Sequence, residues 1–120
     1  MRAREFVVEV KACGDCFKVA GRNMIDDPPP ELTLVHAYVT GQGPVKGKRF
    51  SHAWNEIGDV VIDYSNGKKV VMRKGQYYAL GNIVQEPGQF QRYTQEQALE
   101  NMAKYRHWGP WDLDNQYEKI

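Results

Sequence analysis

The pattern of hydrophobic and polar residues predicts a chain built mainly from short strands. β-Branched and aromatic residues gather in runs of five to ten, and Gly, Pro, Asn and Asp separate these runs. Such alternation of apolar runs with turn residues is typical of an antiparallel sheet. Strands are expected at residues 5–11, 32–40, 49–57, 60–64, 69–73 and 76–85, the last weakened by Gly81.

Two segments show helical spacing instead. Asp15 is a good N-cap residue, which makes Cys16 the first residue of a helix that runs to about Asn23 or Met24. Thr94 opens a capping box (Thr-Gln-Glu-Gln) for a second helix, which ends near Tyr105. The buried stripes are expected at Phe17, Ala20 and Met24 in the first helix, and at Ala98, Leu99, Met102 and Ala103 in the second.

The order of these elements predicts a single α+β domain over residues 1–120. In this fold, an N-terminal helix that carries a cysteine packs on an antiparallel sheet, and a further helix follows near the C-terminus. A length of 120 residues suits one domain, and an apolar fraction of 42% is enough for one core. The proline run at 28–30 is a connector, because neither side of it is long enough to fold alone.

Charge and hydropathy exclude several classes of function. The formal net charge is +1, so neither nucleic acid nor a membrane is an expected partner. The chain has no apolar run of membrane-spanning length, and Glu9 and Lys11 interrupt the apolar stretch near the N-terminus. We therefore expect a cytoplasmic location. There, two cysteines three positions apart favour metal, redox or nucleophilic chemistry over a structural disulfide.

The segment Cys13-Gly14-Asp15-Cys16 places two thiols where a strand gives way to a helix. A free thiol has a pKa near 8.5, so it needs help to react as a thiolate at neutral pH. The N-terminus of a helix supplies partial positive charge and free backbone N–H groups that can bind an oxyanion. Cys16 has both advantages and Cys13 has neither, which makes Cys16 the candidate nucleophile.

His52 and Asp63 are the candidate partners of that thiol. If Gly58-Asp59 forms a two-residue hairpin turn, Trp54 lies opposite Asp63, and His52 points to the same face of the sheet. His52 and Asp63 are then diagonal neighbours within reach of each other. Asp63 can hold one imidazole nitrogen while the other faces Cys16. A three-residue loop would shift the register and send Asp63 to the opposite face.

These residues carry a family resemblance. Residues 13–17, Cys-Gly-Asp-Cys-Phe, are similar to the Cys-Gly-(Ser/Ala)-Cys-(Trp/Tyr) segment around the nucleophile of papain-like proteases. The later part resembles their transglutaminase-like relatives, which have a strand carrying His-Ala-Trp and then a strand ending in Asp before a turn. Residues 52–56 (His-Ala-Trp-Asn-Glu) and 60–65 (Val-Val-Ile-Asp-Tyr-Ser) match that order and spacing. The chain also looks like small proteins of this type encoded by tailed phages, which would place it in the cytoplasm of a host cell.

The resemblance implies a papain-like/transglutaminase-like core and a cysteine hydrolase. Such an enzyme cleaves an amide or peptide bond through a thioacyl intermediate, with a peptide or protein as substrate. Cys16 would be the nucleophile, His52 the general base and Asp63 the residue that orients it. Trp54 and Tyr64 would contact the substrate, and no metal or organic cofactor is implied.

The chain also departs from the papain pattern. Papain-like proteases carry a glutamine before the nucleophile as an oxyanion donor, and no glutamine lies between Met1 and Cys16. Lys11 is the nearest long polar donor, so the second donor of an oxyanion hole stays unassigned.

Other interpretations stay open at this stage. Cys16 can be a buried, inert thiol, Asp63 can cap the Ser65-Asn66-Gly67 turn, and Trp54 can belong to the core. The Cys-x-x-Cys spacing also fits a redox pair or two zinc ligands completed by His36 or His52. A non-catalytic binding module on the same fold is the main alternative to the enzyme.

Overall fold

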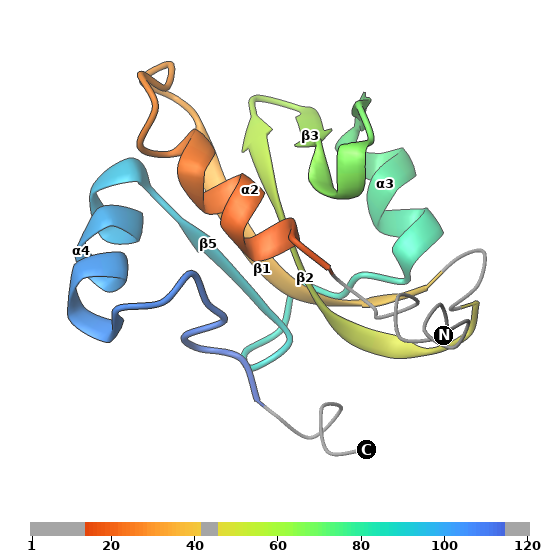
Figure 1. Cartoon of the computed structure of the whole chain (residues 1–120). Coiled ribbons are helices and arrows are strands. Elements are labelled where there is room, and N and C mark those ends of the chain that lie inside the picture. Colours follow the sequence, from red (N-terminus) through yellow and green to blue (C-terminus); the bar gives the residue numbers. More distant parts are fainter. Residues whose placement is uncertain (1–13, 42–45, 115–120) are drawn as a thin grey trace, which may run out of the picture.

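The computed structural model describes residues 14–41 and 46–114. These residues form one antiparallel sheet with helices packed against it (Figure 1). The predicted α+β class with an antiparallel sheet is therefore confirmed. The strand expected at 5–11, with Lys11, lies outside the described residues. The elements are α2 (Cys16–Asn23), β1 (Thr33–Thr40), β2 (Arg49–Ile57), β3 (Val60–Asp63), the 3₁₀ turn η2 (Ser65–Gly67), β4 (Val70–Arg73), α3 (Lys74–Gly81), β5 (Phe90–Tyr93) and α4 (Gln95–Tyr105).

Within the described residues, the sheet has five strands in the order β4-β3-β2-β1-β5. Strands β1 to β4 lie side by side in sequence order. The chain then passes through α3 and returns, so that β5 pairs antiparallel with β1 at the far edge. In Figure 1, β5 and α4 lie on the opposite side of the molecule from β3 and α3.

The turn between β2 and β3 sets the register on which the predicted site depends. Ile57 pairs with Val60, so Gly58 and Asp59 form the two-residue loop that the sequence predicted. Gly58 has a φ of 57°, in the left-handed region that hairpin turns require at this position. The side chains of alternate residues in β2 and β3 consequently face the same side of the sheet, as the hairpin arithmetic predicted.

The sheet separates two buried clusters. We call the side covered by α2 and α4 the α2 face, and the opposite side, covered by α3, the α3 face. The α2 face contributes Leu34, Ala53 and Tyr93, which cluster with Cys16, Ala20, Met24, Leu32 and Ala98. The α3 face contributes Val35, Ala37, Val39, Trp54 and Val61, which cluster with Ile83, Tyr77 and Tyr78.

One predicted strand is wrong and another strand was missed. The segment expected as a strand at 76–85 is the helix α3, from Lys74 to Gly81. Tyr77 and Tyr78 both donate hydrogen bonds to carboxylates on the sheet. Neighbouring residues of a strand point in opposite directions, whereas in a helix they are separated by about 100° and can face the same surface. The four-residue strand β5 was not predicted.

The helix stripes are confirmed for α2 and corrected for α4. Ala20 in α2 and Met24 at its C-cap are buried, with Phe17 packed against the same cluster. In α4, Ala98 is buried and Met102 packs on the core, but Leu99 and Ala103 are exposed. This helix lies beside β5 at the edge of the sheet, so it buries a narrower stripe than predicted.

His36, which the sequence offered as a possible zinc ligand, lies inside an aromatic cluster on the α2 face. Its ring centroid is 4.8 Å from that of Phe17, 5.1 Å from Tyr93 and 4.8 Å from Trp111. Its two ring nitrogens have no hydrogen-bond partner among the described residues. Burial, reinforced by the nearby His107, lowers the pKa of His36 from 6.5 to about 3.

Because His36 stays neutral in the folded protein, its burial predicts a loss of stability in acid. Below pH 6.5 the unfolded chain binds a proton that the folded protein does not, so the free energy of unfolding falls as the pH drops toward 3. The contribution of His36 to this slope approaches about 1.4 kcal/mol per pH unit. We expect His36→Leu to weaken the pH dependence of the free energy of unfolding, measured by urea denaturation between pH 6 and pH 4.5. Parallel profiles of the variant and the wild type would contradict this assignment.

Candidate functional site

The β2–β3 hairpin brings His52 and Asp63 into direct contact on the α3 face. Nε2 of His52 lies 2.9 Å from Oδ2 of Asp63. Both side chains are buried, with exposed fractions of 7% for His52 and 3% for Asp63. The predicted proximity of these two residues is therefore confirmed, and it follows from the two-residue turn at Gly58-Asp59.

Asp63 is held by four hydrogen bonds, two to each carboxylate oxygen. Oδ1 accepts from the backbone N–H and the hydroxyl of Ser65, at 3.1 and 2.6 Å. Oδ2 accepts from the hydroxyl of Tyr77 at 2.7 Å, in addition to His52. Asp63 thus caps the turn that follows β3 and also binds the imidazole, so two roles that the sequence left as alternatives coexist on different oxygens.

These contacts fix the charge state of Asp63. Burial alone would raise the pKa of the carboxyl group, but the hydrogen bonds and charge of His52, with the hydrogen bonds from Ser65 and Tyr77, hold that pKa well below its usual range. Burial and the negative charge of Asp63 in turn raise the pKa of Tyr77. Asp63 is therefore ionised and Tyr77 is a phenol at neutral pH. The proton between Asp63 and His52 accordingly resides on Nε2.

The second nitrogen of His52 remains available. Nδ1 is buried and has no hydrogen-bond partner among the described residues. The ring lies between those of Phe50 and Trp54, with centroid distances of 6.1 and 5.9 Å. An imidazole whose Nε2–H is bound by a carboxylate presents Nδ1 as a proton acceptor. This arrangement suits a general base.

Cys16 begins α2, as predicted, and lies on the other face of the sheet. It is fully buried and belongs to the same cluster as Ala20 and Ala53. Ala53 adjoins His52 in β2, and the two side chains point to opposite faces. Cys16 and Asp63 both line a narrow recess that is too small for a water molecule. A working triad requires a hydrogen bond from the thiol of Cys16 to Nδ1 of His52, and Nδ1 has no hydrogen-bond partner among the described residues.

The start of α2 is attached to the turn that follows Asp63. Asp15 is the N-cap residue, but its side chain does not cap the helix. Its Oδ1 accepts from the backbone N–H of Asn66 at 2.6 Å, and Oδ1 of Asn66 accepts from the N–H of Asp15 at 3.4 Å. These reciprocal bonds hold the helix end that carries Cys16 next to the end of β3 that carries Asp63.

Cys16 is disulfide-bonded in the structure. The sequence contains two cysteines, and the other, Cys13, lies outside the described residues. This corrects the expectation that a disulfide is disfavoured. A Cys-x-x-Cys spacing at the start of a helix suits a disulfide as well as a reactive thiol. Any role of Cys16 as a nucleophile therefore requires reduction first.

The two predicted substrate-contacting residues occupy different environments. Trp54 is only 1% exposed and forms part of the core of the α3 face. Tyr64 is 44% exposed and lines the recess beside Cys16. Of the two, Tyr64 is the one that a substrate can reach without a rearrangement of the core.

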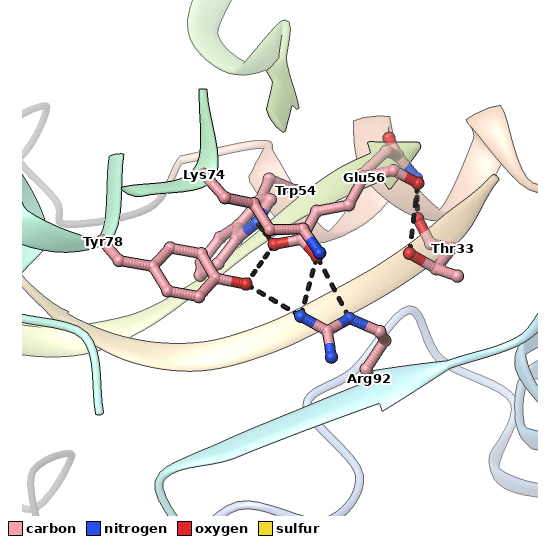
Figure 2. Close-up of polar contacts among 7 residues, drawn as sticks. Thr33, Trp54, Glu56, Lys74, Tyr78 and Arg92 are labelled. Atoms are coloured by element: carbon pink, nitrogen blue, oxygen red, sulfur yellow. Dashed lines mark hydrogen bonds and ion pairs between the residues drawn. The ribbon is translucent and has the colours of Figure 1, made fainter. Parts of the chain in front are cut away.

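A second polar network surrounds Glu56, two residues beyond Trp54 in β2. Oε2 of Glu56 accepts from the indole N–H of Trp54 at 2.9 Å and from the hydroxyl of Tyr78. Oε1 accepts from Nε and Nη2 of Arg92 at 3.1 and 2.9 Å, and Nζ of Lys74 lies 3.6 Å away. Figure 2 shows these side chains converging on one carboxylate from β2, β5 and α3.

The two networks share α3 as a common support. Tyr77 binds Asp63 and Tyr78 binds Glu56, so consecutive residues of one helix attach to carboxylates on two neighbouring strands. Trp54 lies between them, with its ring centroid 5.0 Å from that of Tyr77. Sequence reasoning missed Tyr77 and the Glu56 network, whose contacts link residues up to 36 positions apart, whereas the turn at Ser65 that Asp63 caps was among its alternatives.

A cavity of about 300 Å³ opens beside the His52–Asp63 pair on the α3 face. It is bounded by β strands on one side and by α3 on the other. Its lining residues are Val39, Thr40, Gly41, Phe50, His52, Asp63, Asn66, Lys68, Val70, Met72, Tyr77, Leu80, Gly81 and Ile83.

Comparison with known proteins gives no family assignment. No family model matches the chain, and neither a curated protein nor a solved structure matches it. Within residues 14–41 and 46–114, no three His, Cys, Asp or Glu side chains are grouped to hold a metal ion, so the zinc interpretation gains no support there. No helix in the described part of the chain has the length and apolar character needed to cross a membrane.

Proposed function

We propose that the reduced protein is a cysteine hydrolase that cleaves an amide or peptide bond. Cys16 is the nucleophile, His52 the general base and Asp63 the residue that orients His52. The observation that carries this proposal is the buried His52–Asp63 pair, in which Asp63 binds Nε2 and leaves Nδ1 without a partner among the described residues. A buried ring nitrogen without a hydrogen bond lowers the stability of the folded protein, so a purely structural role does not explain it. A general base needs such a nitrogen to accept a proton.

The reaction follows from these roles. His52 takes the thiol proton on Nδ1 as the sulfur of Cys16 attacks the substrate carbonyl carbon. The tetrahedral oxyanion accepts a hydrogen bond from a backbone N–H in the first turn of α2. His52 then protonates the leaving amine, and the C–N bond breaks to give a thioester on Cys16. Water, deprotonated by His52, releases the carboxylic acid and restores the thiol.

Two changes must precede this chemistry. A dithiol reductant must convert the disulfide of Cys16 to a thiol, becoming oxidised to a disulfide itself. The sulfur must then move from its position beside Ala53 toward Nδ1 of His52. The Asp15–Asn66 bonds support such an approach, because they keep the start of α2 next to the end of β3.

The family resemblance supports the same assignment. In the transglutaminase-like pattern, Cys at a helix start, His-Ala-Trp on one strand and Asp at the end of the next strand act together. In this chain, the helix begins at Cys16, and the two strands pair in the register that brings His52 and Asp63 together. We propose the papain-like/transglutaminase-like core as the finer description of this α+β fold on that basis.

Trapping of the acyl intermediate tests the proposal. The variant Cys13→Ser keeps Cys16 as the single thiol, so no disulfide can form within the chain. We expect p-nitrophenyl acetate to place an acetyl group on Cys16 of this variant, detected by mass spectrometry of the peptide that contains it. Oxidised wild type should react only after treatment with dithiothreitol. An acetylation pattern that is unchanged in Cys13→Ser/Cys16→Ala would contradict the proposal.

A non-catalytic binding module is the second candidate function. The complete burial of Cys16 favours it, since buried thiols are commonly inert. In that case, the cavity on the α3 face would bind a ligand without transforming it. Absence of an acyl adduct on a fully reduced, folded protein would favour this alternative.

A further inference from the structure

The cavity on the α3 face has apolar walls and a polar end. Its apolar lining residues are Val39, Phe50, Val70, Met72, Leu80 and Ile83, and its polar lining includes His52 and Asp63. Its volume of about 300 Å³ is at the lower limit for ligand sites, which suits one large side chain rather than an extended ligand.

The charges around the cavity favour an uncharged occupant. Asp63 is ionised, but its two oxygens already accept hydrogen bonds from Ser65, Tyr77 and His52. Tyr77 is a neutral phenol, because burial and the charge of Asp63 raise its pKa. Lys68 is exposed and belongs to the rim. A charged side chain buried in this space would lose its hydration; both oxygens of Asp63 are already bound, so a cation finds no unbound acceptor there, and the charge of Asp63 repels an anion.

His52 links the cavity to the proposed chemistry. His52 is more than nine-tenths buried, and its Nδ1 lacks a partner among the described residues. The same residue therefore contributes both to the cavity wall and to the proposed chemistry. A side chain placed in the cavity would hold the neighbouring amide of its backbone close to the His52–Asp63 pair.

We propose that this cavity binds a bulky uncharged side chain of the substrate, either aromatic or branched aliphatic, next to the bond that is cleaved. The part of the proposal that concerns cleavage rests on the hydrolase function. Binding of the side chain in the cavity does not require catalysis. Because the cavity buries it, such a side chain is expected to bind with about 10- to 100-fold higher affinity than a charged one.

Adjacent residues of β4 supply a matched pair of variants. Val70 lies opposite Asp63 and lines the cavity, whereas Val71 lies opposite Ile62, faces the other side and is 61% exposed. Val70→Phe should fill the cavity. Val71→Phe adds the same ring on the other side of the strand, where it cannot enter the cavity. Val70→Ala should enlarge the cavity and shift the preference toward larger side chains, which provides a second readout if Val70→Phe folds poorly.

Binding is measured first, by NMR titration of the wild-type protein with N-acetyl-L-phenylalaninamide, N-acetyl-L-leucinamide and their glutamate and lysine counterparts. We expect the Phe and Leu probes to perturb resonances of Val70, Met72 and His52, and to bind at least about 10-fold more tightly than the charged probes. Val70→Phe should weaken this binding at least about 10-fold, and Val71→Phe should leave it unchanged. Equal affinity for charged and apolar probes, or equal effects of the two phenylalanine variants, would overturn the proposal.

A peptide-library cleavage assay separates this inference from the proposed function. Cleavage by the reduced protein without preference for apolar side chains would overturn the inference and leave the hydrolase function standing. Selective binding of the Phe and Leu probes without cleavage of any peptide would support the cavity assignment and contradict the hydrolase function. Cleavage next to bulky apolar residues, lost in Val70→Phe and retained in Val71→Phe, supports both.

Discussion

Replacing His52 with alanine is expected to lower kcat/KM of the reduced protein by about 10³- to 10⁴-fold. His52→Ala removes the imidazole that binds Asp63 and leaves Ser65 and Tyr77 as its described partners, of which Tyr77 stays a phenol at neutral pH because its pKa is raised. Under the proposed mechanism, Cys16 then loses its proton acceptor, and the leaving amine loses its proton donor. The measurement is steady-state hydrolysis of a peptide that the protein cleaves.

The second buried histidine provides the control for this variant. His36 lies on the α2 face among Phe17, Tyr93 and Trp111, away from the cavity. His36→Leu should change the pH dependence of stability while kcat/KM falls less than about threefold. If His36→Leu and His52→Ala reduced kcat/KM equally, loss of packing rather than loss of a base would explain both.

Replacing Glu56 with alanine is expected to lower the free energy of unfolding by about 3–5 kcal/mol. Glu56 is 2% exposed and serves as acceptor for Trp54, Tyr78 and Arg92. Its loss leaves the indole N–H of Trp54 and the O–H of Tyr78 without an acceptor, and removes the counter-charge of Arg92 and Lys74. Equilibrium unfolding in urea, followed by tryptophan fluorescence, measures the effect.

Two further variants define the cause of that loss. Glu56→Gln keeps an acceptor for Trp54 and Tyr78 but removes the charge that faces Arg92, so its cost should be intermediate, about 1–3 kcal/mol. Glu100→Ala changes an exposed glutamate of α4 and should shift stability by less than about 0.5 kcal/mol. A cost below about 1 kcal/mol for Glu56→Ala would show that the network in Figure 2 does not hold α3 against the sheet.

The parts of the fold that the sequence predicted depend on local signals. Gly58-Asp59 is a two-residue turn signal, and it alone determines that His52 and Asp63 share a face. The start of α2 at Cys16 and the capping box at Thr94 are equally local, and both are confirmed. Where a few neighbouring residues decide the geometry, the sequence was sufficient.

The parts that the sequence did not predict depend on contacts between distant residues. The segment at 76–85 has enough aromatic and apolar residues for a strand, but it contributes Tyr77 and Tyr78 to a helix that binds Asp63 and Glu56, which lie 14 and 22 residues away in sequence. β5 is only four residues long and is defined by its pairing with β1. The position of Cys16 beside Ala53 likewise results from how α2 packs across the sheet.

In the proposed mechanism, His52 activates the thiol of Cys16. The rate of Cys16 alkylation as a function of pH tests this activation most directly. Iodoacetamide is applied to folded Cys13→Ser and to Cys13→Ser/His52→Ala, in which Cys16 is the single thiol. We predict a midpoint well below 8.5, the ordinary value for a thiol, in the first protein and a midpoint close to 8.5 in the second. An ordinary midpoint in Cys13→Ser that His52→Ala leaves unchanged would contradict the claim.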